Sequence, residues 1–353
     1  MDSNKNYIYI AITAILIIIF IVFYFVFDNN KIWEKDEFNQ MTDEYYEKME
    51  REKAENINRE SRANEILSET PGIACWGDGL TYGTFGEGVS YPSVLEEIMK
   101  KENYPYSVDN MGVYGEDSRT VLGRTGALPF VIGEDFTIDG NSELIKIDIK
   151  SEDGNVVYPC IQDYNPGFNP CIVDGVKCKI YGETSPVSLT EASAYYLNRQ
   201  DNSTRNVEVS AGTEIMTSGS LDYDNYINIL WIGDGGGYST DTELIEQSER
   251  FADKFGETDK YLIIGRMEGT DEENYTYDRE MEKKFGDHYL NVREILSSEK
   301  IAGVEYSERD KESMEEGSVP NCLKKDEYLK DIGYEAVAEL VFERLKELNI
   351  VNK

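Results

Sequence analysis

The residues with the clearest potential for chemistry lie in the stretch CWGDGLTYG, residues 75–83. An apolar run from Ile73 to Trp76 leads into Gly-Asp-Gly-Leu-Thr, which predicts a strand that ends in a tight loop at the carboxyl edge of an α/β sheet. Catalysis at such an edge needs reactive side chains, such as a nucleophile or an acid–base group. Gly79, at the centre of the loop, offers no side chain for any of these roles.

Two hydroxyl residues, Thr81 and Ser90, lie close to this loop, but neither has an evident base beside it in the sequence. Histidine is the usual proton shuttle near neutral pH, and the chain has a single one, His288. His288 lies in FGDHYLNVREIL, which predicts a loop or the start of a strand. We therefore interpret His288 as a loop histidine that makes a hydrogen bond, not as a catalytic base.

Composition excludes several classes of protein. The chain has 353 residues, of which 40% are hydrophobic, so it can bury a substantial core and is not a disordered chain. The formal net charge is -34, from 69 acidic and 35 basic residues, which makes nucleic acid and anionic membrane surfaces poor partners. The acidic run Asp222 to Asp224, even with Asp234, matches no metal-binding loop, and we expect neither a metal nor a cofactor.

The cysteines are too few for a disulfide scaffold, and their odd number leaves at least one thiol unpaired. Cys75 lies in an apolar strand pattern and is interpreted as a buried, unreactive thiol. Cys160, Cys171 and Cys178 are expected in one β-rich region, where two of them could form a bridge. The remaining cysteine is Cys322.

The N-terminal part of the chain predicts a membrane anchor. After a short tail of residues 1–6, residues 7–27 are uncharged and apolar over about the ~20 residues that a membrane-spanning helix needs. No small-residue cleavage site follows, and Lys5 favours a cytoplasmic N-terminus. We therefore expect an uncleaved single-pass anchor in the cell membrane, with the rest of the chain outside the cytoplasm. Residues 28–70, highly charged with a thin apolar stripe, predict a helical stalk.

Residues 71–353 predict one α/β domain. Apolar strand-like runs alternate with amphipathic helical patterns, for example residues 227–233 followed by 242–255, and 260–265 followed by 277–285. This alternation predicts a parallel sheet covered on both faces. Residues from about 130 to 220 break the rhythm with period-two runs and an Asp174-Gly175 hairpin signal, which predicts a β-rich insertion.

The glycine-rich stretches resemble the sequence blocks of the SGNH, or GDSL, hydrolase superfamily of esterases and lipases, over about residues 73–348. The first block of that superfamily reads Gly-Asp-Ser-Leu-Thr, and residues 77–81 match it except at Gly79, which stands in the place of the nucleophilic serine. The second block matches at residues 110–115. There Gly115 corresponds to the glycine whose backbone N–H serves the oxyanion hole.

The third and fourth blocks depart from the superfamily at their functional positions. Gly235 stands where the resemblance expects the asparagine that donates a side-chain hydrogen bond to the oxyanion. Tyr328 stands in the place of the histidine, and the aspartate of the superfamily falls at Lys325, or at Asp326 with a shift of one residue. The reference pKa of tyrosine, near ~10, makes it a poor base at neutral pH.

The resemblance implies a three-layer α/β/α, flavodoxin-like domain whose catalytic side chains have been replaced. Asp78, Gly79, Gly115, Gly235 and Tyr328 are the expected lining of its ligand-binding pocket. The expected function is that of an inactive esterase homologue that binds a glycan or a partner protein of the cell envelope. Two alternatives stay open: an active acyl esterase or acyltransferase on carbohydrate or lipid that uses a displaced nucleophile, and an assembly protein that acts through its anchor and stalk.

Overall fold

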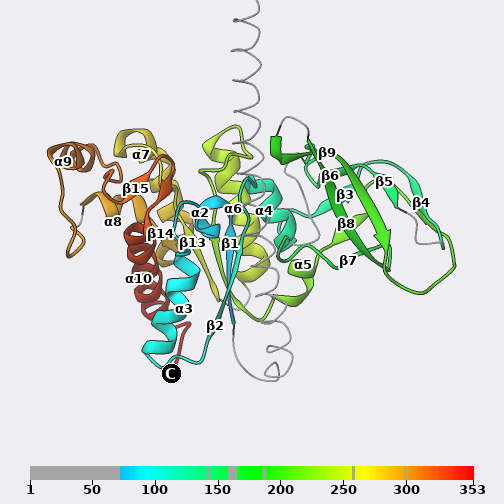
Figure 1. The fold of residues 1–353 in the computed structure, drawn as a ribbon, viewed down its shortest axis with the longest axis horizontal. Helices are drawn as coiled ribbons and strands as arrows, with labels where there is room; N and C mark the ends of the chain where they lie inside the picture. The colour runs from blue at the N-terminus through cyan, green and yellow to red at the C-terminus, as the bar shows by residue number, and fades with distance from the viewer. Residues whose placement is uncertain (1–71, 141–143, 158–164, 186–187, 257–258, 299) are drawn as a thin grey trace, which may run out of the picture. The chain divides into compact units, whose positions relative to one another are not determined.

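The computed structural model describes residues 72–353, apart from residues 141–143, 158–164, 186–187, 257–258 and 299 (Figure 1). The chain divides into the units Met1–Ser68 and Glu69–Lys353, and every described residue belongs to the second. The predicted membrane helix at 7–27, the stalk at 28–70 and Cys160 lie outside the described residues. Among the residues that are described, no helix is both long and apolar enough to cross a membrane.

Five parallel strands form the central sheet. They are β1 (Gly72–Gly77), β2 (Ser107–Gly112), β12 (Ile227–Trp231), β13 (Tyr261–Ile264) and β14 (Tyr289–Leu290), and they lie in the order β14-β13-β12-β1-β2. Strand β1 therefore lies between β2 and β12, with Ile73 opposite Val108 on one side and Ile227 on the other. The predicted parallel α/β sheet is confirmed. Its strand order is that of doubly wound sheets, in which ligands bind outside the carboxyl ends of the strands where the order reverses.

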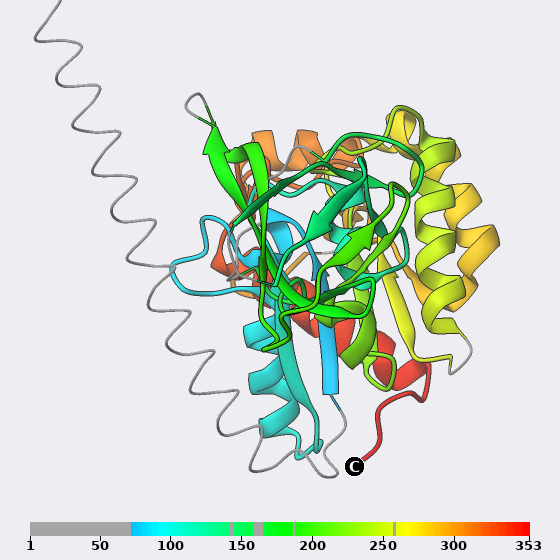
Figure 2. The same cartoon turned by 90° about the vertical axis from the view of Figure 1, so that its right-hand side faces the viewer.

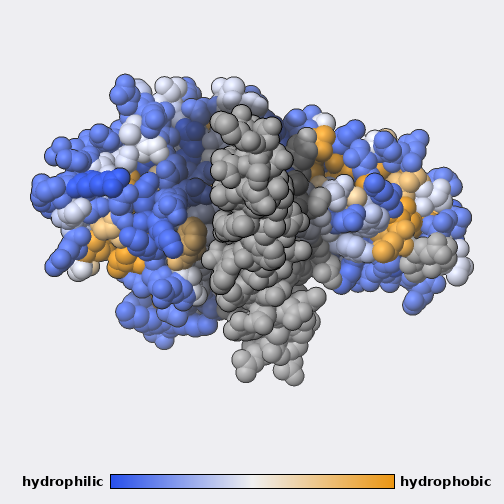
Figure 3. Space-filling view, turned by 45° about the horizontal axis from the view of Figure 1, so that its top comes forward, coloured by the Kyte–Doolittle hydropathy of each residue, from blue (hydrophilic) through white to orange (hydrophobic). Residues whose placement is uncertain are grey.

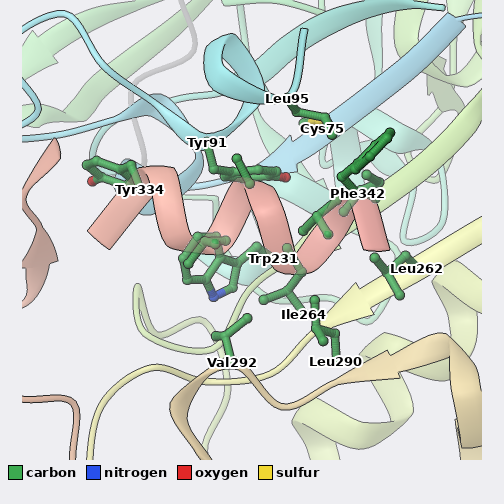
Figure 4. Close-up of a cluster of buried hydrophobic side chains, with 14 of the residues drawn as sticks. Cys75, Tyr91, Leu95, Trp231, Leu262, Ile264, Leu290, Val292, Tyr334 and Phe342 are labelled. Atoms are coloured by element: carbon green, nitrogen blue, oxygen red, sulfur yellow. The ribbon is translucent and has the colours of Figure 1, made fainter. Parts of the chain in front are cut away.

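Helices cover both faces of this sheet because successive residues of its strands point to opposite sides. Ile73 and Cys75 of β1 belong to one hydrophobic core, with α3 (Tyr91–Lys101), α8 (Val292–Ser298) and α10 (Asp331–Glu347) (Figures 1 and 4). Ala74 and Trp76 belong to a second core, with α4 (Ser118–Thr125), α6 (Asp241–Phe255) and α7 (Asp271–Phe285). Helices α6 and α7 pack side by side (Figure 2). All six residues of β1 are buried, as expected for the central strand of such a sheet.

Short polar side chains fix the starts of the principal helices. Ser90, Thr240 and Thr270 each accept a hydrogen bond from the backbone N–H three residues later, at the starts of α3, α6 and α7. These bonds satisfy N–H groups that have no partner within the helix. The Ser90 bond bears on function, because it assigns that hydroxyl to helix capping.

Residues 130–216 form a separate β-rich core. Seven strands are arranged in the order β5-β9-β8-β7-β11-β3-β6, and β10 pairs with β4. Their bounds are β3 (Phe130–Ile132), β4 (Phe136–Ile138), β5 (Ile145–Ile147), β6 (Ile149–Ser151), β7 (Cys171–Val173), β8 (Val176–Ser185), β9 (Ser188–Arg199), β10 (Val207–Val209) and β11 (Glu214–Met216). The Asp174-Gly175 turn joins β7 to β8 with φ values of 46° and 75°, the left-handed conformations that a two-residue hairpin requires.

The structure divides two stretches that the sequence pattern presents as single runs. The period-two run at residues 144–150 contributes to both β5 and β6, which pair with β9 and β3 respectively. The run at 206–216 likewise becomes β10 and β11, in different sheets. Period-two alternation is the same whether a run stays in one sheet or changes partner, so it does not reveal such a break.

The remaining elements are short or peripheral: α2 (Gly79–Tyr82), α5 (Ser218–Asp222), α9 (Glu308–Glu315), the 3₁₀ helix η2 (Gly286–His288), β15 (Lys324–Lys325) and β16 (Tyr328–Leu329). Strands β15 and β16 form a hairpin in which Lys325 lies opposite Tyr328. Strand β16 packs against α2, so this hairpin lies beside the loop that follows β1.

The four described cysteines are free thiols. Cys75 is fully buried in the first core, and burial raises the pKa of its thiol far above the usual range, in agreement with an unreactive side chain. Cys171 and Cys178 lie opposite each other on β7 and β8, both fully buried. A bridge involving Cys160 stays a prediction, because that residue is not described.

Candidate functional site

The loops that follow β1, β2 and β12 meet at the carboxyl edge of the sheet and bring the predicted site residues together. A Cβ placed on Gly235 would lie 2.6 Å from Asp78 Oδ2 and 2.8 Å from the carbonyl oxygen of Glu116. Gly235 therefore contacts both the loop that carries Gly79 and the loop that carries Gly115. The hairpin β15–β16 adds Tyr328 to the same place.

Tyr328 fills the space into which a side chain on residue 79 would project. A Cβ on Gly79 would lie 2.6 Å from Cε1 and 3.2 Å from the hydroxyl oxygen of Tyr328, and 3.0 Å from Thr84 Oγ1. Real Cβ atoms do not come within 3.0 Å of other heavy atoms, so even an alanine at 79 requires the ring to move. Gly79 and the ring of Tyr328 are thus complementary in shape.

This contact predicts a strong energetic coupling between residues 79 and 328. Gly79→Ser is expected to lower the free energy of unfolding by about 1–3 kcal/mol, the usual cost of overpacking. Tyr328→His, which removes the outer part of the ring, is expected to recover most of that loss in the double variant. Urea unfolding of the two single variants and the double variant measures the coupling. Additive losses would show that the two side chains do not compete for the same space.

The carboxylate of Asp78 lies in the space that a side chain at residue 235 would enter. Its carboxylate accepts a hydrogen bond of 2.9 Å from the N–H of Leu80, as the N-cap of α2, and another from the N–H of Gly235. Burial and the nearby charge of Asp234 raise the pKa of Asp78 to about 7, against the pull of these bonds. An asparagine at 235 would meet both this carboxylate and the rigid backbone of Glu116, so it does not fit without a backbone shift.

A buried ion pair supports the loop that contains Gly115. Glu116 and Arg124 are 2% and 0% exposed and lie 2.7 Å apart, and Arg124 also donates to the carbonyl oxygen of Pro166. Asn165 donates to the other carboxylate oxygen of Glu116. Burial raises the pKa of Glu116 to about 7, although Arg124 opposes this shift. The pair therefore joins the site loop to the segment that precedes β7.

Asp234 supports the loop after β12 in a similar way. Its carboxylate accepts hydrogen bonds of 3.0 Å from the N–H groups of both Met267 and Glu268. Burial raises its pKa to about 6. Asp234 thus connects this loop to the loop after β13. Among the described residues, no group of acidic, histidine or cysteine side chains could hold a metal ion.

Within the part of the chain that the structure describes, the site holds no hydroxyl paired with a base. Thr81 is fully buried, and Ser90 caps α3 while it accepts a bond of 3.2 Å from Asn110. His288 lies at the opposite edge of the sheet, where it contacts the carbonyl oxygen of Tyr261 at 2.8 Å and Asp259 at 3.1 Å. His288 ends the 3₁₀ helix η2 instead of lying in a loop, but it makes the predicted hydrogen bond there, away from the site. The phenol of Tyr328 has a pKa raised above its usual value by burial, Tyr114, Glu327 and Asp78, so it stays protonated at neutral pH.

Aromatic rings that the sequence analysis did not single out surround Tyr328. The ring of Phe85 lies 5.5 Å from that of Tyr328, edge to face, and the ring of Tyr114 lies 6.3 Å away. Both rings contact Tyr328, yet 47% of Phe85 and 38% of Tyr114 are exposed to solvent. Tyr114 lies inside the second sequence block, so its position was visible in the sequence but its exposure was not. We call Phe85, Tyr114 and Tyr328 the aromatic cluster.

Comparison with known proteins adds one structural likeness. No protein-family model matches the sequence, and no curated protein matches it. The crystal structure of the lipase/acylhydrolase from Enterococcus faecalis is similar to this chain with a TM-score of 0.41 and 10% sequence identity, over 80% of this chain and 97% of that one. The protein is thus a mixed α/β chain with a parallel sheet and a distant likeness to a lipase/acylhydrolase structure.

Proposed function

We propose that residues 71–353 form a degenerate SGNH-like domain that binds a ligand at the carboxyl edge of its sheet without hydrolysing it. The observation that carries this proposal is the ring of Tyr328 in the space of a side chain at Gly79. An ester hydrolase of this kind needs a hydroxyl at 79 and a base at 328. Here the first is absent, and the second is a protonated phenol that excludes it.

The ligand of the proposed domain is a glycan or a partner protein of the cell envelope. Two features support this class of ligand. The apolar residues 7–27 predict an anchor that places the acidic domain outside the cytoplasm, and aromatic rings are exposed at the site. The anchor itself belongs to the proposal, because it depends on residues outside the described part of the chain. Protease accessibility on intact cells is the measurement that tests on which side of the membrane the domain lies.

The purified full chain is expected to show no turnover above background on short acyl esters or acetylated sugars. Loss of a whole triad leaves only ~10³- to 10⁴-fold acceleration over water, and loss of one oxyanion donor removes a further ~10²- to 10³-fold. A spectrophotometric esterase assay and an acetate-release assay measure the rate, with an active esterase as the positive control.

The opposing outcome would be robust hydrolysis that is lost on changing Thr81 or Ser90 and unaffected by changing Tyr328. It would favour the alternative of an esterase with a displaced nucleophile. The burial of Thr81 and the capping role of Ser90 argue against that alternative. The alternative of an assembly protein rests on the anchor and stalk, and no described residue favours it.

A further inference from the structure

The aromatic cluster already holds a cation. Lys325 lies opposite Tyr328 in the β15–β16 hairpin, and its ammonium nitrogen is 4.6 Å from the centre of the Phe85 ring. An ammonium group at this distance is attracted by the negative face of the ring. Lys325 is exposed and its stem is flexible, so its ammonium can leave this face and another can take its place.

Phe85 is held in a costly conformation that its packing does not explain. Its φ is 61°, in the left-handed region that favours glycine, and a bulky residue there is strained. Its ring is nevertheless 47% exposed, so little burial offsets the strain. Strained residues cluster at functional sites, and the strained backbone here directs an aromatic face toward the surface beside Gly79.

The charge around the cluster favours a cationic ligand. The turn of the hairpin consists of Asp326 and Glu327, both exposed, and the charges of Glu327 and Asp78 act on the phenol of Tyr328. The whole chain carries a formal net charge of -34. In Figure 3, hydrophilic residues dominate the face in view, and hydrophobic residues form separate patches. The net negative charge of the chain attracts basic partners and repels anionic polysaccharides.

We propose that the aromatic cluster binds the ammonium group of a lysine side chain in a basic segment of a partner protein, which displaces Lys325 from the face of Phe85. This inference rests on the proposed function and selects the partner protein over the glycan. Phe85 provides the ring face, and Tyr328 and Tyr114 flank it. Lys325 acts as an internal competitor that keeps the site filled when no partner is bound.

The first arm of the test examines the ring. Binding of a fluorescent lysine-rich peptide to the full chain in detergent is measured by anisotropy, with the same peptide acetylated at every lysine as the neutral control. Phe85→Leu is expected to weaken binding about 2- to 5-fold, the range of an exposed cation–π contact, while the fold stays intact by circular dichroism. Tyr275→Leu is the matched control, because Tyr275 is 65% exposed on α7 and outside the cluster, and it is expected to leave binding unchanged.

The second arm examines the competitor. Lys325→Gln is expected to tighten peptide binding more than Lys283→Gln, which removes the same charge from an exposed position of α7. General attraction to an acidic protein would affect both variants equally, so the difference isolates the cluster. Weaker binding in Lys325→Gln, equal effects of the two variants, or equal binding of the acetylated peptide would each overturn the inference.

A glycan-array screen separates this inference from the proposed function. Binding of a neutral or anionic glycan that depends on Phe85 would overturn the lysine ligand and leave the proposed non-catalytic domain standing. Ester turnover by the unmodified protein would overturn the proposed function itself. Peptide binding that depends on Phe85, with no turnover, supports both.

Discussion

Arg124→Met is expected to lower the free energy of unfolding by about 3–5 kcal/mol at neutral pH, because it leaves the buried carboxyl group of Glu116 without its ion-pair and hydrogen-bond partner. The substitution also removes the hydrogen bond from Arg124 to the carbonyl oxygen of Pro166. Urea unfolding followed by circular dichroism measures the change. The expected loss is a large fraction of the stability of an ordinary domain.

The matched control is Arg250→Met. Arg250 also pairs with a glutamate, Glu152 at 2.8 Å, but the two side chains are 47% and 53% exposed. Exposed pairs contribute about 0–1 kcal/mol, so the control is expected to change stability little. A double variant, Arg124→Met with Glu116→Gln, is expected to recover part of the loss because it removes the buried acid that has lost its partner. Similar losses in Arg124→Met and Arg250→Met would show that burial of the first pair has no energetic consequence.

Stability is expected to fall by roughly 3 kcal/mol or more as the pH rises from about 5 to about 8. Asp78 and Glu116 have folded-state pKa values of about 7, and Asp234 of about 6, all above their values in an unfolded chain. At pH values between the unfolded and the folded pKa of each group, the folded state binds more protons than the unfolded state. Protonation of these carboxyl groups therefore stabilises the fold below about pH 6–7, and this stabilisation is lost at higher pH. Thermal unfolding across this pH range measures the effect.

Other carboxyl groups do not reverse this trend. Hydrogen bonds lower the pKa values of five carboxyl groups: Asp153, Asp201, Glu273, Glu308 and Asp310. For Asp153, partial burial opposes this shift without cancelling it. Their contribution is complete above their unfolded values and is lost only at lower pH, below the window of the measurement. Asp78→Asn is expected to flatten the dependence between about pH 5 and 7, and an unchanged slope in that variant would refute the role assigned to Asp78.

The sequence predicts the parallel sheet well because the information is local. Residues 227–231, apolar except for Asn228, form a run too short for a helix, and an amphipathic helix follows it, which is the signature of a β-α unit. The Asp174-Gly175 turn is likewise local, since the two residues themselves adopt the required φ values. The three glycine loops converge because the carboxyl ends of parallel strands lie at one edge of a sheet.

The details of the site depend on contacts between distant segments and could not be read in the same way. The sequence shows a glycine at 79 and a tyrosine at 328, but not that the ring enters the space of the missing side chain. Glu116 and Arg124 are polar residues in a polar stretch, and only the structure shows that both are buried. The same holds for Phe85, whose contact with Lys325 joins two segments far apart in the sequence.

The position of the β-rich residues has a consequence for synthesis of the chain on the ribosome. The central strands pair Ile73 with Ile227, so β1 leaves the ribosome long before its neighbour β12 exists. Residues 130–216 have a hydrophobic core of their own and can fold during this interval, whereas the parallel sheet must wait. Until β12 is made, the apolar strand β1 keeps unpaired backbone groups on at least one edge, which exposes it to wrong strand pairing.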